Sequence, residues 1–270
     1  MKFCVVFFTL LLFQLEAVIP EKVVICTICR DVSDYLPSMI PYLEDMGSLF
    51  EDYRIVAYEN NSEDDTPSQL YRWKSENPKV SISVEFLSKT EYAGTIINTI
   101  EGQFSRSEQK AQARNKALMM ALSSPYEEFS HVIWIDLNVD PPSLKAIEET
   151  FQKGEEWDAV FAYLVDSNGN FSDKNAFRDS LFPLGPELLG DDWHEEIKNF
   201  TLNERNEWRP VYSAFGGYAI YKREAIAHAK YKAIVTPCLG SIYRKWFFTG
   251  IDTNNQSCKT YLKNIKNITI

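Results

Sequence analysis

A short, mostly apolar run, His131-Val-Ile-Trp-Ile135, ends abruptly in the polar residues Asp136, Asn138 and Asp140. This pattern predicts a buried strand of a parallel sheet that delivers oxygen ligands to the edge of that sheet. Alternate residues of an extended chain share a face, so we expect the three polar side chains to point the same way. Carboxylate and amide oxygens suit Mg²⁺ or Mn²⁺ bound to a diphosphate. The alternative is a strand that stops at a polar turn, with Asp140-Pro-Pro-Ser143 starting the next helix.

Strand-like and helix-like segments alternate along most of the chain. Short apolar stretches predict strands at 22–28, 53–58, 80–86, 131–135 and 157–163. Helical spacing and good helix formers predict helices at 67–76, 105–122 and 142–152, with a further helix after the first strand. This order predicts an α/β domain with a mostly parallel, doubly wound sheet and helices on both faces.

The helix after the first strand is expected to begin at Ser33 or Asp34, because either side chain can act as an N-cap. Its apolar residues recur at helical spacing: Leu36, Met39, Ile40, Leu43, Met46 and Phe50. The acidic turn before the next helix has a similar interpretation. We expect Asp64, Asp65 and Thr66 to cap the helix that Pro67 opens.

The regular pattern breaks at about residue 164. Residues 211–221 then resume as a strand or a hairpin around Gly216-Gly217, and 222–230 look helical. No pattern follows Tyr231. The chain is therefore expected to divide into a targeting segment at 1–20, one folded domain at 21–230 and an irregular extension at 231–270.

The N-terminus has the pattern of a targeting segment. Met1-Lys2 precedes an apolar stretch over 3–13, which predicts a secretory signal, with a short uncleaved membrane anchor as the alternative. Asn-x-Ser/Thr sequons occur at Asn60, Asn170, Asn199, Asn255 and Asn267. They favour the secretory pathway (the lumen of the endoplasmic reticulum or Golgi, or secretion) in a eukaryote. A bacterial source would make the chain exported or membrane-anchored.

The cysteines give a weaker signal. Cys26 and Cys29 have the Cys-x-x-Cys spacing of redox and metal sites, but no second such pair accompanies them and Cys29 leads directly into Arg30, which disfavours a redox role. Cys238 and Cys258 are able to pair in an oxidising compartment.

Charge and missing motifs exclude several classes of function. The formal net charge is −10, which disfavours nucleic acid as a partner. The Gly-x-Gly-x-x-Gly fingerprint, the P-loop and the Gly-x-Ser-x-Gly elbow are all absent from the sequence. An anionic ligand would need local help from arginine, lysine, a metal ion or helix N-termini.

Three motifs occur in an order that is typical of one class of enzyme. They are Glu59-Asn-Asn-Ser-Glu-Asp-Asp-Thr66, Ala111-Gln-Ala-Arg-Asn-Lys-Ala-Leu118 and Trp134-Ile-Asp-Leu-Asn-Val139. Together they resemble the nucleotide-sugar glycosyltransferases of the GT-A fold. The families with the most similar motifs are the fungal capsule-associated mannosyltransferases and the Golgi mannan polymerase subunits. The resemblance covers residues 22–225 and implies a metal-assisted hexosyltransferase, with mannosyl transfer as one form of it. The implied partners are a nucleotide-sugar donor and a glycan or other hydroxyl acceptor.

The resemblance also implies roles for individual residues. Mn²⁺ or Mg²⁺ would be held by Asp136, Asn138 and Asp140. The donor would be bound by Arg30, Glu59, Asn60, Arg114, Asn115, Asp136, Gly216 and Gly217. Independently of the resemblance, the acidic and aromatic stretch 182–193 suits a sugar acceptor, and Glu187, Asp191 or Asp192 is a candidate for the base of an inverting reaction. The alternative is a solvated loop with an aromatic anchor.

Three of these assignments carry stated expectations or alternatives. Arg114 would grip phosphate with its planar fork, whereas the alternative is a surface arginine that contacts Lys110 or Leu118 on its own helix. Asn60 is expected to remain unglycosylated, because a glycan there would block the donor pocket. Gly216 and Gly217 would let the backbone approach the donor sugar closely.

The sequence also departs from the family pattern. Asn138 stands where the family has a second acidic residue, so the metal site loses a charge. No Glu-His pair follows the Gly-Gly strand, as it usually does in related enzymes. Two alternatives therefore remain: a non-catalytic subunit with a GT-A-like fold, and another nucleotide-using α/β transferase.

Overall fold

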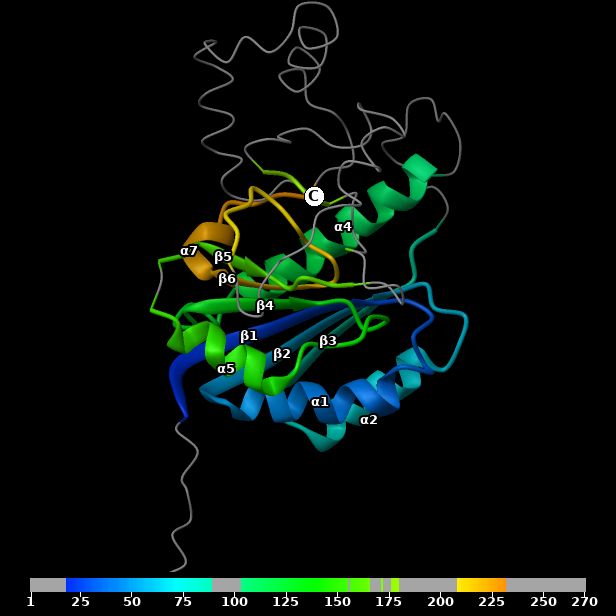
Figure 1. Ribbon diagram of the computed structural model, residues 1–270. Coiled ribbons are helices and arrows are strands. Elements are labelled where there is room, and N and C mark those ends of the chain that lie inside the picture. The colour runs from blue at the N-terminus through cyan, green and yellow to red at the C-terminus, as the bar shows by residue number, and fades with distance from the viewer. Residues whose placement is uncertain are drawn as a thin grey trace, which may run out of the picture.

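Strands rich in β-branched and apolar residues build the centre of the molecule. A computed structural model describes residues 18–88, 103–154, 156–165, 171, 176–179 and 208–231. Within these residues, six strands form one sheet in the order β3-β2-β1-β4-β6-β5 (Figure 1). The strands are β1 (Ile19–Cys29), β2 (Phe50–Asn60), β3 (Val80–Glu85), β4 (His131–Ile135), β5 (Ala159–Phe161) and β6 (Tyr218–Lys222).

The sheet is mixed, with a parallel half and an antiparallel half. β1 pairs in parallel with both β2 and β4, and β2 pairs in parallel with β3. β6 runs antiparallel to β4 on one side and to β5 on the other. The predicted α/β class with a mostly parallel sheet is therefore confirmed. β4 coincides with the predicted strand at 131–135.

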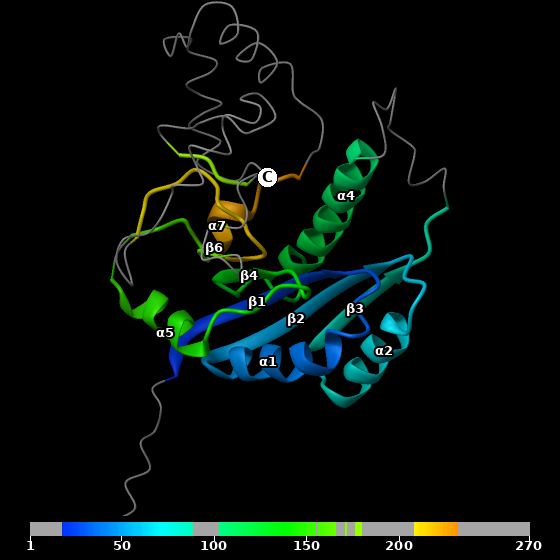
Figure 2. The ribbon, with the colours of Figure 1, turned by 45° about the vertical axis from the view of Figure 1, so that its right-hand side comes forward.

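Helices cover both faces of the sheet, as predicted (Figures 1 and 2). On one face lie α1 (Leu36–Ser48), α2 (Thr66–Glu76) and α5 (Leu144–Gln152), and on the other lie α4 (Gln103–Leu122) and α7 (Arg223–Ile226). The buried face of α4 includes alanines four residues apart, Ala113, Ala117 and Ala121. These small side chains let α4 lie close to the sheet. Among the described residues, no helix has both the length and the apolar character needed to cross a membrane.

Helix starts were predicted with mixed success. The prediction of Ser33 or Asp34 as the first N-cap is wrong: α1 starts at Leu36, and its N-cap Tyr35 makes no side-chain capping bond. Phe50 begins β2 and is not part of α1. α5 begins at Leu144, two residues after the predicted start at 142, and Ser143 caps it, because its hydroxyl accepts a hydrogen bond from the N–H of Ala146 at 3.2 Å.

Of the predicted N-terminal segment and C-terminal extension, the described residues include only the ends that adjoin the folded domain. β1 starts at Ile19, so the fold begins two residues before the predicted limit at 21. Tyr231 is buried, with 5% of its surface exposed, and packs in the core on the α4 side of the sheet. The predicted targeting segment and extension otherwise lie outside the described residues.

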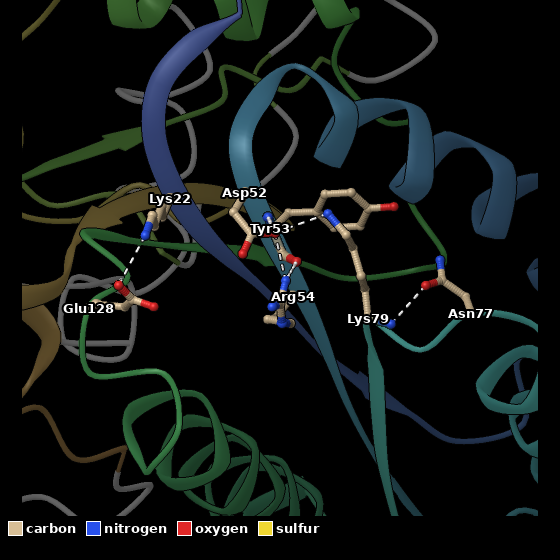
Figure 3. A network of polar contacts seen from close by, with 7 residues as sticks. All are labelled: Lys22, Asp52, Tyr53, Arg54, Asn77, Lys79 and Glu128. Atoms are coloured by element: carbon tan, nitrogen blue, oxygen red, sulfur yellow. Dashed lines mark hydrogen bonds and ion pairs between the residues drawn. The ribbon is translucent and has the colours of Figure 1, made fainter.

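A network of polar contacts connects residues near the starts of the strands, at the amino edge of the sheet (Figure 3). The Asp52 carboxylate accepts hydrogen bonds from Arg54 Nη1 at 2.6 Å, the Tyr53 N–H at 2.8 Å and Lys79 Nζ at 3.0 Å. Lys22 bonds Glu128 at 3.0 Å beside it. Burial opposes ionisation of Asp52, but the hydrogen bonds from Lys79, Arg54 and Tyr53 outweigh it and lower its pKa.

We expect Asp52→Asn to lower the free energy of unfolding at pH 7 by about 1 kcal/mol or less, because the pair is partly exposed. A lowered carboxyl pKa stabilises the fold above the unfolded-state pKa of about 3.9, and that stabilisation is lost as the pH falls through the folded-state pKa. Urea titrations from pH 7 to pH 2.5 should therefore show the difference between wild type and variant shrinking. A difference that stays constant over this range would contradict the role of the Asp52 charge.

Candidate functional site

The carboxyl ends of the parallel strands gather polar residues at one edge of the sheet. β1, β2 and β4 run in the same direction, with Cys29 beside Glu59 and Cys26 beside Trp134. Residues that follow these strands therefore meet at the same edge, which is where open α/β sheets bind ligands.

An ion pair between Arg114 and Asp136 is the central contact of this edge. Arg114 Nη2 lies 3.1 Å from Asp136 Oδ2 and 3.4 Å from Oδ1. The side chains are 9% and 20% exposed, respectively. The alternative of a surface arginine is therefore wrong, since Arg114 lies on the buried face of α4. Two of the three sequence motifs meet in this one contact, which joins residues 22 positions apart in the sequence.

Arg114 and its neighbour Asn115 hold two different parts of the chain. The guanidinium carbon of Arg114 lies 4.8 Å from the centre of the Phe215 ring and 5.8 Å from that of Tyr231. The Asn115 amide donates to the Tyr231 carbonyl at 2.9 Å and accepts from the Tyr231 N–H at 2.8 Å. Asn115, predicted to bind donor, thus fixes the backbone of Tyr231 against Arg114.

Gly217 fixes the loop that carries the metal motif. Its carbonyl accepts the N–H of Asp136 at 2.8 Å. Its φ is +115°, and a Cβ on Gly217 would lie 2.9 Å from a methyl carbon of Val139. The sequence therefore needs glycine here for backbone conformation and for contact with its own chain. Gly216 precedes it in the same buried turn, and the approach of either glycine to a donor sugar stays a prediction.

The metal motif turns earlier than predicted. The chain leaves extended geometry after Ile135 and turns at Leu137 and Asn138, so the expected strand-like alternation is not kept. Asn138 and Asp140 are exposed, whereas Asp136 is partly buried. Among the described residues, no three His, Cys, Asp or Glu side chains stand together as a metal cluster. Asp136 and Asp140 are the two carboxylates of the motif, and the metal-binding role of the three residues stays a prediction.

The Glu59–Thr66 motif braces two loops instead of presenting a row of side chains to solvent. Its acidic and hydroxyl side chains accept hydrogen bonds from backbone N–H groups of the loop after β1. Ser62 Oγ accepts from the Asp31 N–H at 3.0 Å, Asp64 Oδ2 from the Ser33 N–H at 3.0 Å, and Thr66 Oγ1 from the Val32 N–H at 2.9 Å. In return, Asp31 Oδ1 accepts the N–H of Glu63 at 2.7 Å.

The residues predicted as helix caps take part in this brace. The Ser33 N–H donates a hydrogen bond to the Asp64 carboxylate. Burial of Asp64 by itself would raise the pKa of this carboxyl, but hydrogen bonds from Thr66 and Ser33 outweigh burial and lower the pKa. Asp64 Oδ1 also accepts the N–H of Thr66 at 3.0 Å, as expected for the start of α2, but the N-cap Asp65 makes no side-chain capping bond. Sequence reasoning predicted these residues as local caps and missed their cross-loop role.

The remaining predicted donor residues lie at the same edge. The Glu59 side chain is fully buried: Oε1 accepts the N–H of Ser62 at 2.8 Å, while Oε2 has no hydrogen-bond partner among the described residues. Asn60 is 6% exposed, and its predicted lack of a glycan stays a prediction. Arg30 is exposed, with Nε 3.6 Å from Asp31 Oδ2. Asp31 and Asn61 have left-handed φ values of 51° and 58°, strain that often accompanies functional loops.

The Cys26-x-x-Cys29 spacing does not form a redox site. The two thiols belong to core clusters on opposite faces of the sheet, and both are free. Burial raises the pKa of each thiol, and the charge of Glu59 raises that of Cys29 further. Both thiols are therefore protonated and unreactive at neutral pH.

Several predicted residues lie outside the described residues. They are the candidate bases Glu187, Asp191 and Asp192, the cysteines Cys238 and Cys258, and the sequons Asn170, Asn199, Asn255 and Asn267. Their predicted roles are unchanged by the structure.

Comparison with known proteins gives similarity at the level of structure alone. No family model and no curated protein sequence matches this chain. The mannosyltransferase PcManGT from Pyrobaculum calidifontis, in complex with GDP-Man and Mn²⁺, is 14% identical with a TM-score of 0.41. That similarity covers 82% of this chain and 50% of the other, so the chain spans half the length of that protein.

Two further solved structures are similar to the same degree. Glucosyl-3-phosphoglycerate synthase from Mycobacterium tuberculosis, in complex with UDP, is 12% identical with a TM-score of 0.39, covering 86% of this chain and 68% of the other. S. aureus TarS 1-349 is 15% identical with a TM-score of 0.42, covering 83% and 53%. Scores this low do not establish a shared activity.

The brace predicts a difference between two substitutions of the fully buried Thr66. Thr66→Val keeps the shape but leaves the Val32 N–H without its acceptor, which should lower the free energy of unfolding by about 1 to 3 kcal/mol. Thr66→Ser keeps the hydroxyl. Hydrogen exchange should show faster exchange of the Val32 amide in Thr66→Val than in Thr66→Ser. Equal protection in both variants would mean that the hydroxyl does not hold the loop.

Proposed function

We propose that this chain is a glycosyltransferase of the GT-A type, which moves a sugar from a nucleotide-sugar donor to a hydroxyl acceptor with the help of a divalent metal. The observation that carries the proposal is the ion pair between Arg114 and Asp136 at the carboxyl edge of the sheet. It joins the helix motif to the strand-end motif, and the third motif braces the loops at the same edge.

The chemistry of sugar transfer accounts for this arrangement. A nucleoside diphosphate leaves with negative charge, and a preorganised site must stabilise that charge. Asp136 would hold Mn²⁺ or Mg²⁺, assisted by Asn138 through its amide oxygen and by exposed Asp140 through its charge. The bound metal would neutralise charge on the diphosphate as the bond to the sugar breaks.

Arg114 acts in this proposal by orienting Asp136. Its Nη2 is bound to the carboxylate, and the guanidinium is packed against Phe215 and Tyr231. A buried guanidinium in this position fixes the carboxylate in one orientation. In the competing role, predicted from the sequence, Arg114 binds the donor phosphate directly.

The rest of the donor would lie along the ends of β1 and β2. Glu59 and Asn60 end β2, where base and ribose contacts are expected, and exposed Arg30 follows β1 within reach of an anionic ligand. Glu187, Asp191 and Asp192 remain candidates for the base that activates the acceptor hydroxyl. The secretory location also remains a proposal.

A second function is favoured by one specific residue. Asn138 replaces the second carboxylate of the family motif, which weakens the attraction for a divalent metal. A non-catalytic subunit that binds nucleotide sugar without transferring it would tolerate this loss. Turnover with a sugar acceptor separates the two functions.

The proposal predicts a metal-dependent thermal shift with nucleotide sugars. GDP-mannose or UDP-glucose, tested with and without Mn²⁺, should raise the melting temperature, since ligand at 100-fold excess over its Kd stabilises by about 2.7 kcal/mol. Asp136→Ala should abolish the Mn²⁺-dependent part of this shift. Asp158→Ala, which removes an exposed carboxylate just before β5, is the matched control. A full shift in a folded Asp136→Ala variant would remove this site from the proposal.

The two roles of Arg114 predict different outcomes for Arg114→Gln. If Arg114 orients Asp136, the variant should lose most of the Mn²⁺-dependent gain and keep metal-free binding of nucleoside diphosphate. If it grips phosphate, metal-free diphosphate binding should weaken by about 1.5 to 3 kcal/mol, and nucleoside binding should not change. Calorimetric titration of both ligands distinguishes these results. Lys116→Gln, which removes an exposed cation of α4 bonded to Glu85, is the control.

A further inference from the structure

Four buried polar groups on the α4 side of the sheet lack hydrogen-bond partners. They are Arg114 Nε, Trp134 Nε1, Tyr221 Oη and Tyr231 Oη, and none has a partner among the described residues. Their residues are 7%, 0%, 0% and 5% exposed, respectively. All four groups carry a polar hydrogen, and the arginine and tryptophan groups can only donate.

The four side chains belong to one cluster. The Trp134 and Tyr231 rings lie 5.6 Å apart, centre to centre, and the Arg114 guanidinium carbon lies 5.8 Å from the Tyr231 ring centre. Tyr221, on β6, faces the same core as Trp134. Tyr221 pairs with Val132, two residues before Trp134 on the neighbouring strand β4, and it packs in the same core cluster as Trp134 and Tyr231.

Such a concentration of donors is costly without an acceptor. Each buried donor left unpaired costs about 1 to 3 kcal/mol, and most buried polar groups in proteins are paired. The Asp136 carboxylate is the charged neighbour, but it is bound by Arg114 Nη2 and not by Nε. An acceptor placed among the four groups would satisfy several donors at once.

We propose that Arg114, Trp134, Tyr221 and Tyr231 enclose a site for a small hydrogen-bond acceptor, a halide ion or an ordered water. The bound acceptor holds Arg114 by Nε, on the side of the guanidinium that Asp136 does not use. It thereby positions Nη2 against the carboxylate. The site does not depend on the proposed sugar transfer, so its test needs neither donor nor turnover.

The test uses the sign of a stability change. A tyrosine hydroxyl without a partner is a burden, so its removal is neutral or stabilising, whereas a bonded hydroxyl stabilises the fold. Tyr221→Phe and Tyr231→Phe should each raise the equilibrium constant for unfolding about fivefold, the factor that corresponds to about 1 kcal/mol. Tyr126→Phe is the matched control, because its hydroxyl lies 2.6 Å from Ser81 Oγ. The proposal is overturned if Tyr221→Phe and Tyr231→Phe are as stable as wild type while Tyr126→Phe is destabilised.

A second measurement identifies the acceptor. Thermal midpoints of wild type are compared in sodium chloride, sodium bromide and sodium gluconate at equal ionic strength. A halide ion should raise the midpoint relative to gluconate, and this gain should be lost in Tyr221→Phe. An ordered water should give equal midpoints in all three salts while Tyr221→Phe stays destabilised. Both results support the site and assign its occupant.

Discussion

The contact between Arg114 and Asp136 depends on most of the fold, and the site depends on it. It requires α4 to lie close to the sheet, which its buried alanines permit, and β4 to stop at Ile135 so that the next side chain can turn toward the helix. Buried charge pairs are stabilising only when their geometry and remaining hydrogen bonds are well satisfied. Such a pair is therefore weak evidence for stability and better evidence for a carboxylate that must be held in one orientation.

Around this contact, the edge of the sheet is stiffened by backbone hydrogen bonds. The loops after β1 and β2 are tied together by Ser62, Asp64 and Thr66, and the metal-motif loop is tied to Gly217. Loops that carry ligand contacts are usually the mobile parts of a fold, and binding then costs the entropy of ordering them. Here these hydrogen bonds already order the loops when the protein folds, so binding would lose less conformational entropy. A preorganised edge of this kind suits a site that must stabilise charge.

The sequence predicted the elements well where the signal was local. β4 and α2 are set by apolar runs and by Pro67, and both were placed within one residue. It failed where contacts between residues distant in sequence decide the structure. Ser33 looks like an N-cap, but its backbone is tied to Asp64, 31 residues away, and α1 begins only at Leu36. Arg114 looks like a surface residue of a polar helix, but its partner lies on another element. Pairing across the fold cannot be read from spacing along the sequence.

On the proposed function, the ion pair also affects how a metal ion and a nucleotide would bind together, because it changes the net charge of the metal motif. Arg114 neutralises the charge of Asp136, and Asn138 contributes none, so Asp140 supplies the remaining net charge of the motif. One net negative charge at an exposed position attracts a divalent cation weakly in water. A diphosphate brings the missing negative charge and several oxygen ligands with it. On the proposed function, the metal motif would therefore receive a metal already bound to a nucleoside diphosphate, and the loss of the second carboxylate would couple the binding of the two ligands.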